Sequence, residues 1–233
     1  RIRATFHQTV TRTGRLSSDA PNLHNIPIRT EAGKAFRKAF IPANKHLLLV
    51  ADYNQIELRC IAHLADEKEL KAAFNDGQDI HTAVAARTWG IKPDEIDSTL
   101  RSRAKMVSYG LAYGMEAYGL AQRLDIPVDE ASEILKAFFD AFPGVKDYMN
   151  ESIEIARKKG YTETLLGRRR KIPELLSSNF NIRQAGERQA MNAPIQGLAA
   201  DVFKMALVSI DQELQKELYR SALVLQVHDE VIL

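Results

Sequence analysis

The sequence has little cysteine, no long apolar run and no dominant sign of charge. Cys60 is the one cysteine among 233 residues, so an internal disulfide is excluded and a reduced, intracellular setting is expected. No apolar run approaches the roughly 18 residues of a membrane span, and no signal peptide opens the chain. The net charge is +2 and 45% of the residues are hydrophobic, which excludes disordered, collagen-like and coiled-coil classes.

The basic residues are concentrated in two segments. Residues 1–15 carry four arginines and no acidic residue, and residues 157–171 carry seven basic residues against Glu163. Two basic segments in a near-neutral chain are typical of a protein that binds a polyanion on one face. The alternative, which holds more often for a single basic run, is that the charges form solvated surface.

The hydrophobic pattern predicts strands toward both ends of the chain and helices between them. This order predicts one sheet domain that carries a helical insertion. Pro194 should kink or break the helix in which it lies. The expected strands are residues 47–51, 161–166, 223–227 and 231–233, and the expected helices lie within 54–64, 66–159 (among them 128–142) and 184–217.

Acidic residues occupy positions that suit metal binding or catalysis. Asp52 ends an apolar strand, and Asp229 and Glu230 lie in the turn between two apolar strands. Hairpin turns favour Gly or Asn, and this turn has neither, which indicates selection for something else. Carboxylates on adjacent strands could bind two Mg²⁺ ions about 3.5–4 Å apart, the arrangement for in-line phosphoryl transfer. Alternatively, Asp52 marks a helix entry, and Asn54 and Glu57 are spaced like a capping box.

A third pattern repeats every four residues as Arg101, Lys105, Tyr109 and Tyr113. On a helix these side chains form one slowly turning stripe with two cations followed by two aromatic rings. A nucleoside triphosphate has the same order, since its phosphates precede its sugar and base. A solvated basic edge beside two core tyrosines explains the spacing equally well.

Taken together, these motifs resemble those of the family A DNA polymerases, the family of bacterial DNA polymerase I. The likeness runs in order along essentially the whole chain. The segments that carry it are residues 52–59, similar to motif A; 101–114, similar to motif B; 227–230, similar to motif C; 13–18 with 21–27, similar to the palm-entry signature; and the further familiar stretches 166–170 and 188–197.

The resemblance implies the α+β fold of a right-hand polymerase, with an antiparallel palm sheet that carries a helical fingers insertion. Residues 1–63 and 186–233 would form the palm, truncated at its C-terminus, and residues 64–185 the fingers. The first and last residues suggest a fragment that lacks the thumb, any exonuclease domains and the last palm strands. On its own, such a fragment is expected to be inactive.

The resemblance also implies a role for each matching residue. Asp52 and Asp229 would hold two Mg²⁺ ions, with Glu230 in a supporting role. Arg101, Lys105 and His81 would bind the incoming triphosphate, with Lys105 also acting in catalysis, although His81 alone would more naturally be a structural histidine. The other expected nucleotide contacts are Gln55, Glu57 (the steric gate against the 2′-hydroxyl), Tyr109 at the sugar, and Tyr113 beside the nascent base pair.

Contacts with DNA follow from the same resemblance. Arg188 would lie near the template strand, and the residues expected near the primer terminus and its minor groove are Arg15, Asn192, Gln196 and His228. The implied partners are primer–template DNA and deoxynucleoside triphosphates, without a membrane. The parent protein is expected to be a cytoplasmic, nucleoid-associated monomer that acts in replication and repair.

Three positions depart from the common family pattern. Asn54 stands where Ser is frequent and can still cap a helix. His24 stands where Gln is frequent, which puts any contact carried over to it in doubt. Tyr109 stands where Phe is frequent, a change that bears on sugar discrimination.

Other functions give different expectations. A single-subunit RNA polymerase shares the architecture, but Glu57 and the turn at residues 228–230 favour DNA synthesis. A catalytically dead relative that binds nucleic acid would not need both metal aspartates and both phosphate-binding cations. An unrelated two-metal phosphohydrolase would need neither the 101–114 motif nor the palm-entry signature.

Overall fold

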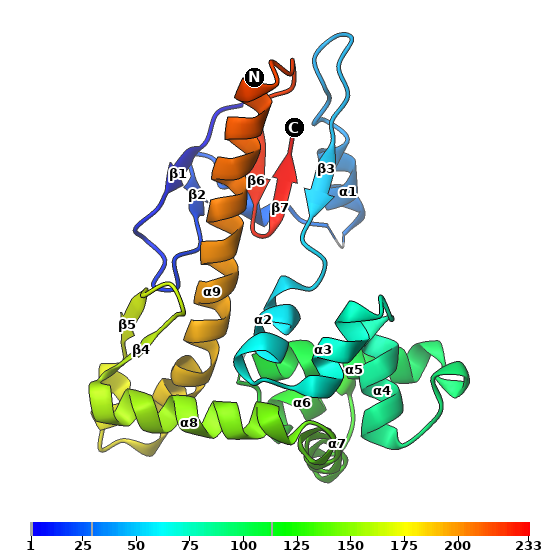
Figure 1. Cartoon of the computed structure of the whole chain (residues 1–233), viewed down its shortest axis with the longest axis vertical. Coiled ribbons are helices and arrows are strands. Elements are labelled where there is room, and N and C mark those ends of the chain that lie inside the picture. Colours follow the sequence, from blue (N-terminus) through cyan, green and yellow to red (C-terminus); the bar gives the residue numbers. More distant parts are fainter. Residues whose placement is uncertain (1, 29, 113) are drawn as a thin grey trace. The chain divides into compact units, whose positions relative to one another are not determined.

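The computed structural model of the chain describes residues 2–28, 30–112 and 114–233. Helices dominate this part of the chain, and short antiparallel strands form small sheets (Figure 1), which confirms the expected α+β class. The strands are β1 Thr5–His7, β2 Ser17–Asp19, β3 Val50–Asp52, β4 Tyr161–Glu163, β5 Arg169–Lys171, β6 Leu225–Val227 and β7 Glu230–Ile232. The α-helices are α1 Glu31–Arg37, α2 Ile56–Leu64, α3 Lys68–Asn75, α4 Ile80–Trp89, α5 Ser98–Ala112, α6 Ala117–Leu124, α7 Val128–Ala141, α8 Pro143–Lys159 and α9 Phe180–Lys216, with 3₁₀ turns η1 Leu23–Asn25, η2 Pro93–Glu95 and η3 Pro173–Leu176.

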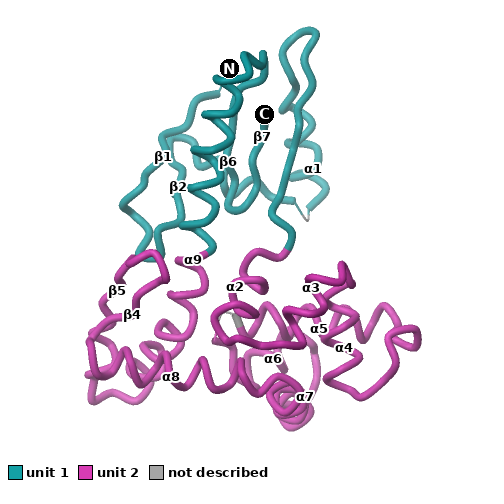
Figure 2. Tube along the Cα trace, in the orientation of Figure 1, with its two compact units in different colours: residues 1–54, 199–233 teal, residues 55–198 magenta. Residues whose placement is uncertain are grey.

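Two compact units make up the chain (Figure 2). Unit 1 consists of residues 1–54 and 199–233, and unit 2 of residues 55–198. Unit 2 is therefore inserted into unit 1 in sequence, and α9 contributes residues to both. The expected palm and fingers boundaries, after residues 63 and 185, stay a prediction, since a packing unit need not coincide with a functional domain.

Unit 1 is built around the three-stranded antiparallel sheet β3-β7-β6. The register places Asp52 opposite Glu230, and Val227 also opposite Glu230 on the other side of β7. The Tyr53 ring and the Phe203 ring of α9 pack in a T-shaped arrangement, with their centroids 5.9 Å apart. The chain directly after β3 is thus anchored to α9.

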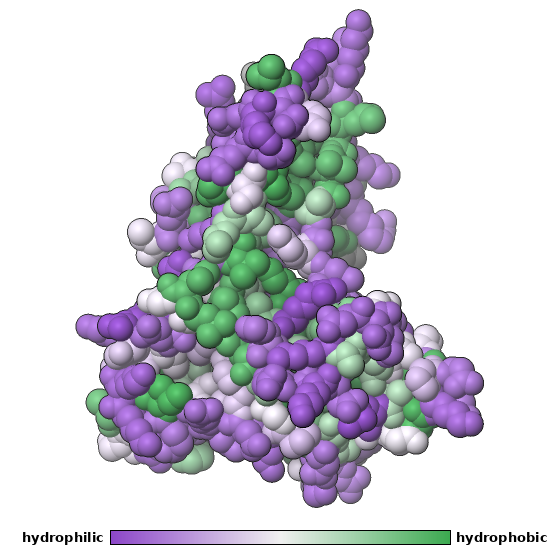
Figure 3. Space-filling model, in the orientation of Figure 1, coloured by the Kyte–Doolittle hydropathy of each residue, from purple (hydrophilic) through white to green (hydrophobic). Residues whose placement is uncertain are grey.

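The strand expected at residues 47–51 is shorter and more exposed than its apolar sequence suggests. β3 begins at Val50, although backbone hydrogen bonds join Leu49 and Leu233 in both directions. All of β3 is exposed, because it is an edge strand that pairs with β7 on one side, and pairing alone does not cover its side chains. Figure 3 shows apolar surface (green) on the face of the molecule in view. Leu47, before β3, is 90% exposed.

Unit 2 holds most of the buried apolar side chains. The successive helices expected over residues 66–159 are confirmed, and the helix expected at 128–142 is α7, which ends at Ala141. α4 packs against α5 and α7, and α6 packs against the same two helices. Phe138 and Phe142 are almost fully buried, with ring centroids 4.9 Å apart. The helix α5 is therefore held on a rigid helical base.

The longest helix continues through its proline, which excludes the break that was one of the two expected outcomes. α9 runs through Pro194 without a break, so that proline produces at most a kink. Pro194 lies between Ala193 and Ile195, all three are buried, and this packing compensates for the lost backbone hydrogen bond. By length and composition α9 could also cross a membrane, but half of its most apolar window is buried inside the structure, as core helices of globular proteins also are.

Candidate active site

Three of the expected acidic residues lie together at one end of the three-stranded sheet of unit 1. Asp52 is the last residue of β3 and lies directly opposite Glu230, the first residue of β7. Asp229 is joined to the same place, because the Tyr53 backbone N–H donates to the Asp229 carbonyl at 3.1 Å. Strand register therefore fixes all three carboxylates on rigid backbone.

Like charges repel within this cluster. Partial burial, and secondly the Asp229 carboxylate, raise the pKa of Asp52 above its ordinary value. Partial burial, and secondly the Asp52 carboxylate, raise the pKa of Glu230. The ionised form of these carboxylates is thus destabilised when no cation is bound. Binding of a cation would relieve the repulsion between them.

Arg15 supplies one positive charge to the cluster. Its Nη2 atom lies 3.5 Å from both carboxylate oxygens of Asp229, and the side chains are 21% and 22% exposed. Arg15 and Asp229 are 214 residues apart, so tertiary structure alone creates the contact. Arg15 therefore belongs to the carboxylate cluster, a contact that its expected place near the primer terminus did not predict.

The turn that carries Asp229 is backbone-strained and is supported by histidines. His228 has φ +54°, in the left-handed region that non-glycine residues rarely adopt. The His228 ring lies 5.2 Å from the ring of His24, whose Nε2 atom is 3.0 Å from the Gln226 carbonyl oxygen. Burial, followed by the nearby Arg15 charge, lowers the pKa of His228. Buried His24 thus braces the hairpin, a role for which the sequence carried no signal.

The donors in this cluster fit magnesium. Carboxylate oxygens are ligands that Mg²⁺ prefers, and one or two of them commonly hold it together with substrate phosphates and water. Among the described residues, no group of three or more His, Cys, Asp or Glu side chains could hold a metal ion alone. Two mutually repelling aspartates therefore fit a metal shared with a substrate better than a cage made only of protein.

In unit 2, the cationic stripe lies on α5 as the four-residue spacing predicts. Arg101 donates two hydrogen bonds to Asp79, and Lys105, one turn further along the helix, is exposed. Tyr109 follows, with its ring 5.8 Å from the ring of His81. Tyr113, the last expected member of the stripe, lies outside the described residues.

His81 is buried, whereas a side chain that binds phosphate at the surface is expected to be exposed. It is 2% exposed, and its Nδ1 atom has no hydrogen-bond partner within the described part of the chain. Burial is the main cause that lowers its pKa, which the Asp79 carboxylate opposes. Its ring is therefore favoured in the neutral form, and its place against Tyr109 fits both a structural role and a site role.

The start of α2 carries two further expected nucleotide contacts. Gln55 is the N-cap residue, with φ +56°, and Glu57 is the second residue of the helix. The capping-box alternative is therefore wrong, because Asn54 does not occupy the N-cap position that the box requires. Glu57 is only 4% exposed, so a side chain with a charged end is held within the protein.

The expected DNA contacts of unit 2 follow one face of α9. Arg188, Asn192 and Gln196 recur every four residues and are all partly exposed. Glu116, the N-cap residue of α6, accepts hydrogen bonds from Arg188 Nη1 at 3.3 Å and Gln184 Nε2 at 2.9 Å. Glu116 thus holds Arg188 in place, which sequence reasoning did not anticipate.

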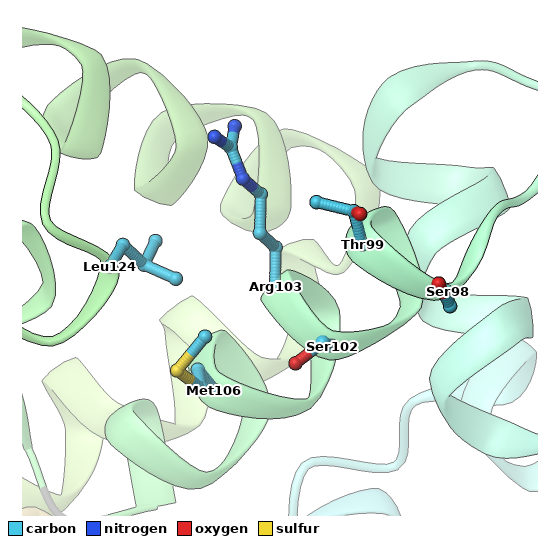
Figure 4. Close-up of a pocket in the computed structure, with 6 residues that line it drawn as sticks. All are labelled: Ser98, Thr99, Ser102, Arg103, Met106 and Leu124. Atoms are coloured by element: carbon cyan, nitrogen blue, oxygen red, sulfur yellow. The ribbon is translucent and has the colours of Figure 1, made fainter.

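A separate cavity of about 370 Å³ lies between α5 and the end of α6 (Figure 4). Its lining residues are Ser98, Thr99, Ser102, Arg103, Met106 and Leu124. Arg103 is occupied by an ion pair with Glu130 at 3.1 Å. None of the expected nucleotide-binding residues lines the cavity, so the cavity is not the expected nucleotide site.

A sequence model of the family described as DNA polymerase family A matches residues 1–233, the whole chain. The chain belongs to DNA polymerase family A. DNA polymerase I of Mycobacterium tuberculosis is 52% identical over 233 residues, and that of Bacillus caldotenax is 47% identical over 234 residues. All of this chain is covered in both comparisons, but only 26% and 27% of those proteins, so it spans about a quarter of their length.

Family A polymerases also provide a close structural match. The polymerase domain of Pol1 from M. smegmatis, solved in complex with DNA primer–template and dNTP, superposes with a TM-score of 0.94 at 52% identity. The superposition covers 100% of this chain and 41% of that one. The resemblance drawn from the motifs is therefore confirmed at the level of family and fold.

Proposed function

We propose that the protein containing this chain is a DNA-directed DNA polymerase, which adds deoxynucleoside triphosphates to a primer 3′ end in DNA replication and repair. The observation that supports it best is the cluster of Asp52, Asp229 and Glu230 in a family A polymerase chain. Their mutual repulsion suits a site that gathers cations around a phosphoryl group.

Within this proposal, Asp52 and Asp229 hold two Mg²⁺ ions. When bound, such ions neutralise charge on the phosphates and lower the pKa of the attacking primer hydroxyl. Glu230 adds a supporting negative charge opposite Asp52. Rigid strand ends suit the task, because in-line transfer depends on the position of the attacking oxygen.

Residues of unit 2 bind the incoming nucleotide. Arg101 and Lys105 contact its phosphates through charge-assisted hydrogen bonds, and Lys105 also stabilises the charge that develops during transfer. Glu57 crowds the 2′ position of the sugar, and Tyr109 lies against the sugar. The remaining proposed contacts of the nucleotide are Gln55, His81 and Tyr113.

Primer–template DNA is the second proposed partner, and the M. smegmatis complex supports both partners. Arg188 lies near the template, and the proposed contacts near the primer terminus are Arg15, Asn192, Gln196 and His228. Donors along the minor groove can test the shape of a base pair without reading its sequence. The full-length protein is proposed to act as a monomer in the cytoplasm, associated with the nucleoid and without a membrane.

A primer-extension assay with the full-length protein tests this function. Template-directed extension with deoxynucleotides and Mg²⁺, abolished by EDTA, is the expected result. Preferential extension with ribonucleotides would instead indicate an RNA polymerase. DNA binding without any extension would indicate an inactive relative and would contradict the proposal.

A further inference from the structure

Arg101, the first cation of the stripe, is held by an internal carboxylate. Its Nε atom donates to Asp79 Oδ1 at 3.0 Å, and its Nη2 atom donates to Asp79 Oδ2 at 2.7 Å. The pair joins α5 to the residue before α4, and the two side chains remain 44% and 43% exposed. A phosphate group binds guanidinium through the same two-pronged geometry, so it would compete for these donors.

The Asp79 carboxylate is itself fixed by the start of α4. As the N-cap residue, it accepts hydrogen bonds at Oδ1 from Thr82 N at 2.8 Å and from Thr82 Oγ1 at 2.9 Å. The Arg101 guanidinium and these bonds hold the pKa of Asp79 well below its usual range. The carboxylate is therefore ionised at neutral pH, and it cannot follow Arg101 without losing the helix cap.

We propose that Asp79 sets the affinity of the polymerase for nucleotides, by holding the Arg101 guanidinium until an incoming triphosphate displaces it. This inference rests on the proposed function, in which Arg101 binds the triphosphate. An affinity is weakened in proportion to the fraction of protein that is competent to bind. A partly exposed ion pair leaves about a fifth to a half of the molecules with Arg101 unpaired. Nucleotide binding is therefore weakened by about two- to fivefold.

The competition has a signature of its own. Asp79 competes with the phosphates, which all four nucleotides share, and not with a base or a sugar. The affinity should therefore shift by the same factor for every deoxynucleotide. Asp79 is a positioning residue in this account, because it acts through Arg101.

The substitution Asp79→Asn removes the ion pair with Arg101 and keeps the N-cap of α4. Asparagine caps helices as well as aspartate does, and its Oδ1 atom can still accept hydrogen bonds from Thr82. Its side-chain NH₂ group carries no charge and cannot accept a hydrogen bond from Arg101 Nη2, so the ion pair is lost. In single-turnover incorporation by the full-length protein, Asp79→Asn should lower the nucleotide Kd about two- to fivefold, with the change in Kd and not in the maximal rate. Asp79→Ser, which also caps helices, should give the same direction.

Asp97→Asn is the matched control. Asp97 caps α5 by accepting from Leu100 N at 2.7 Å, and Arg101 N donates to its backbone carbonyl at 3.0 Å. The control thus removes one negative charge near Arg101 and leaves the Asp79 pair intact. A decrease in Kd of the same size in Asp97→Asn would show a general charge effect and would overturn the inference.

A double-mutant cycle with Arg101→Ala separates this inference from the function on which it rests. If Asp79 acts through Arg101, Asp79→Asn should have no effect on Kd in the Arg101→Ala background. An effect that remains there would show that Asp79 acts by another route, such as through His81, and would overturn the inference. An unchanged or raised Kd in both Asp79 variants, with Arg101→Ala still weakening binding, would overturn the inference and leave the function standing. An unchanged Kd in Arg101→Ala itself would overturn the inference together with the proposed role of Arg101, and primer extension would still test the polymerase function.

Discussion

The two units balance charge in opposite ways. In unit 1, three carboxylates converge, and partial burial together with a neighbouring carboxylate raises the pKa values of Asp52 and Glu230. The positive charge of Arg15 lies 3.5 Å from Asp229. In unit 2, the first cation of the stripe has a close internal partner, since Arg101 binds Asp79 through two hydrogen bonds. The carboxylate cluster therefore has an excess of negative charge, whereas the stripe begins with a neutralised arginine.

The difference shows how each part should respond to its ligands. Cations entering the cluster in unit 1 relieve repulsion that already exists, so binding there needs no bond to be broken. A triphosphate that reaches Arg101 must first displace Asp79, so binding there is an exchange of partners. Substitutions should consequently abolish function in unit 1 and adjust it in unit 2.

The largest effect is expected at Asp52 and Asp229, the aspartates proposed to bind the metal ions. In the full-length protein, Asp52→Asn or Asp229→Asn should reduce nucleotide addition by about three or more powers of ten, since the charge that holds the metals is lost. Binding of primer–template should persist, because contacts between basic residues and phosphates carry most of that affinity. The measurement is a single-turnover rate with Mg²⁺ beside a DNA-binding titration.

Asp211→Asn is the matched control in unit 1, because Asp211 is exposed on α9 and pairs only locally with Gln215 at 2.8 Å. Its rate should equal that of the wild type. A near-normal rate in either active-site variant would remove that aspartate from the metal site.

A smaller effect is expected from Lys105→Ala. Loss of a charge-assisted contact should weaken use of the triphosphate by about 10- to 150-fold and change DNA affinity little. Nucleotide Kd and DNA Kd should be compared, with Lys136→Ala as the control, since Lys136 is exposed on α7 and pairs with Asp140. Equal losses for nucleotide and DNA would assign Lys105 to the template instead.

Tyr109→Phe tests the first aromatic ring of the stripe. A dideoxynucleotide lacks the 3′-hydroxyl that can hydrogen-bond within its own triphosphate, and the phenol hydrogen of Tyr109 can replace that donor. The parent enzyme should therefore accept dideoxynucleotides readily, and Tyr109→Phe should restore discrimination by about 10- to 150-fold.

The quantity to measure is the ratio of kcat/KM for deoxy and dideoxy substrates in both proteins. Use of normal nucleotides should change little, because phenylalanine keeps the ring beside His81. If that ratio moves by less than about threefold, the tyrosine serves packing and takes no part in sugar selection.

The effect expected at Glu57 is confined to the choice between deoxyribose and ribose. Glu57→Ala should relax rejection of ribonucleotides by about 10- to 200-fold, the range that small steric differences in a pocket produce. Glu57→Gln keeps the volume and should keep the discrimination. Because the side chain is buried, a urea titration should accompany both variants; lowered stability with an unchanged ratio of deoxy to ribo incorporation would make Glu57 structural.

The sequence by itself was enough to predict the family, the α+β class and the positions of most helices. These predictions depend on local information, since helical periodicity, strand ends and motif spacing are all set by residues near one another in the chain. Asp52 at a strand end and Arg101, Lys105 and Tyr109 along one helix are of this kind.

Only the tertiary structure decided which of these residues meet. The pairing of Asp52 with Glu230 depends on strand register, and the contacts of Arg15 with Asp229 and of Arg101 with Asp79 join residues 214 and 22 positions apart. The exposure of β3 was likewise missed, because neighbours distant in sequence determine burial. The sequence left open whether Pro194 kinks or breaks its helix, and the structure shows that α9 continues through it. Such contacts form where folded elements pack, and no local pattern of residue types specifies them in advance.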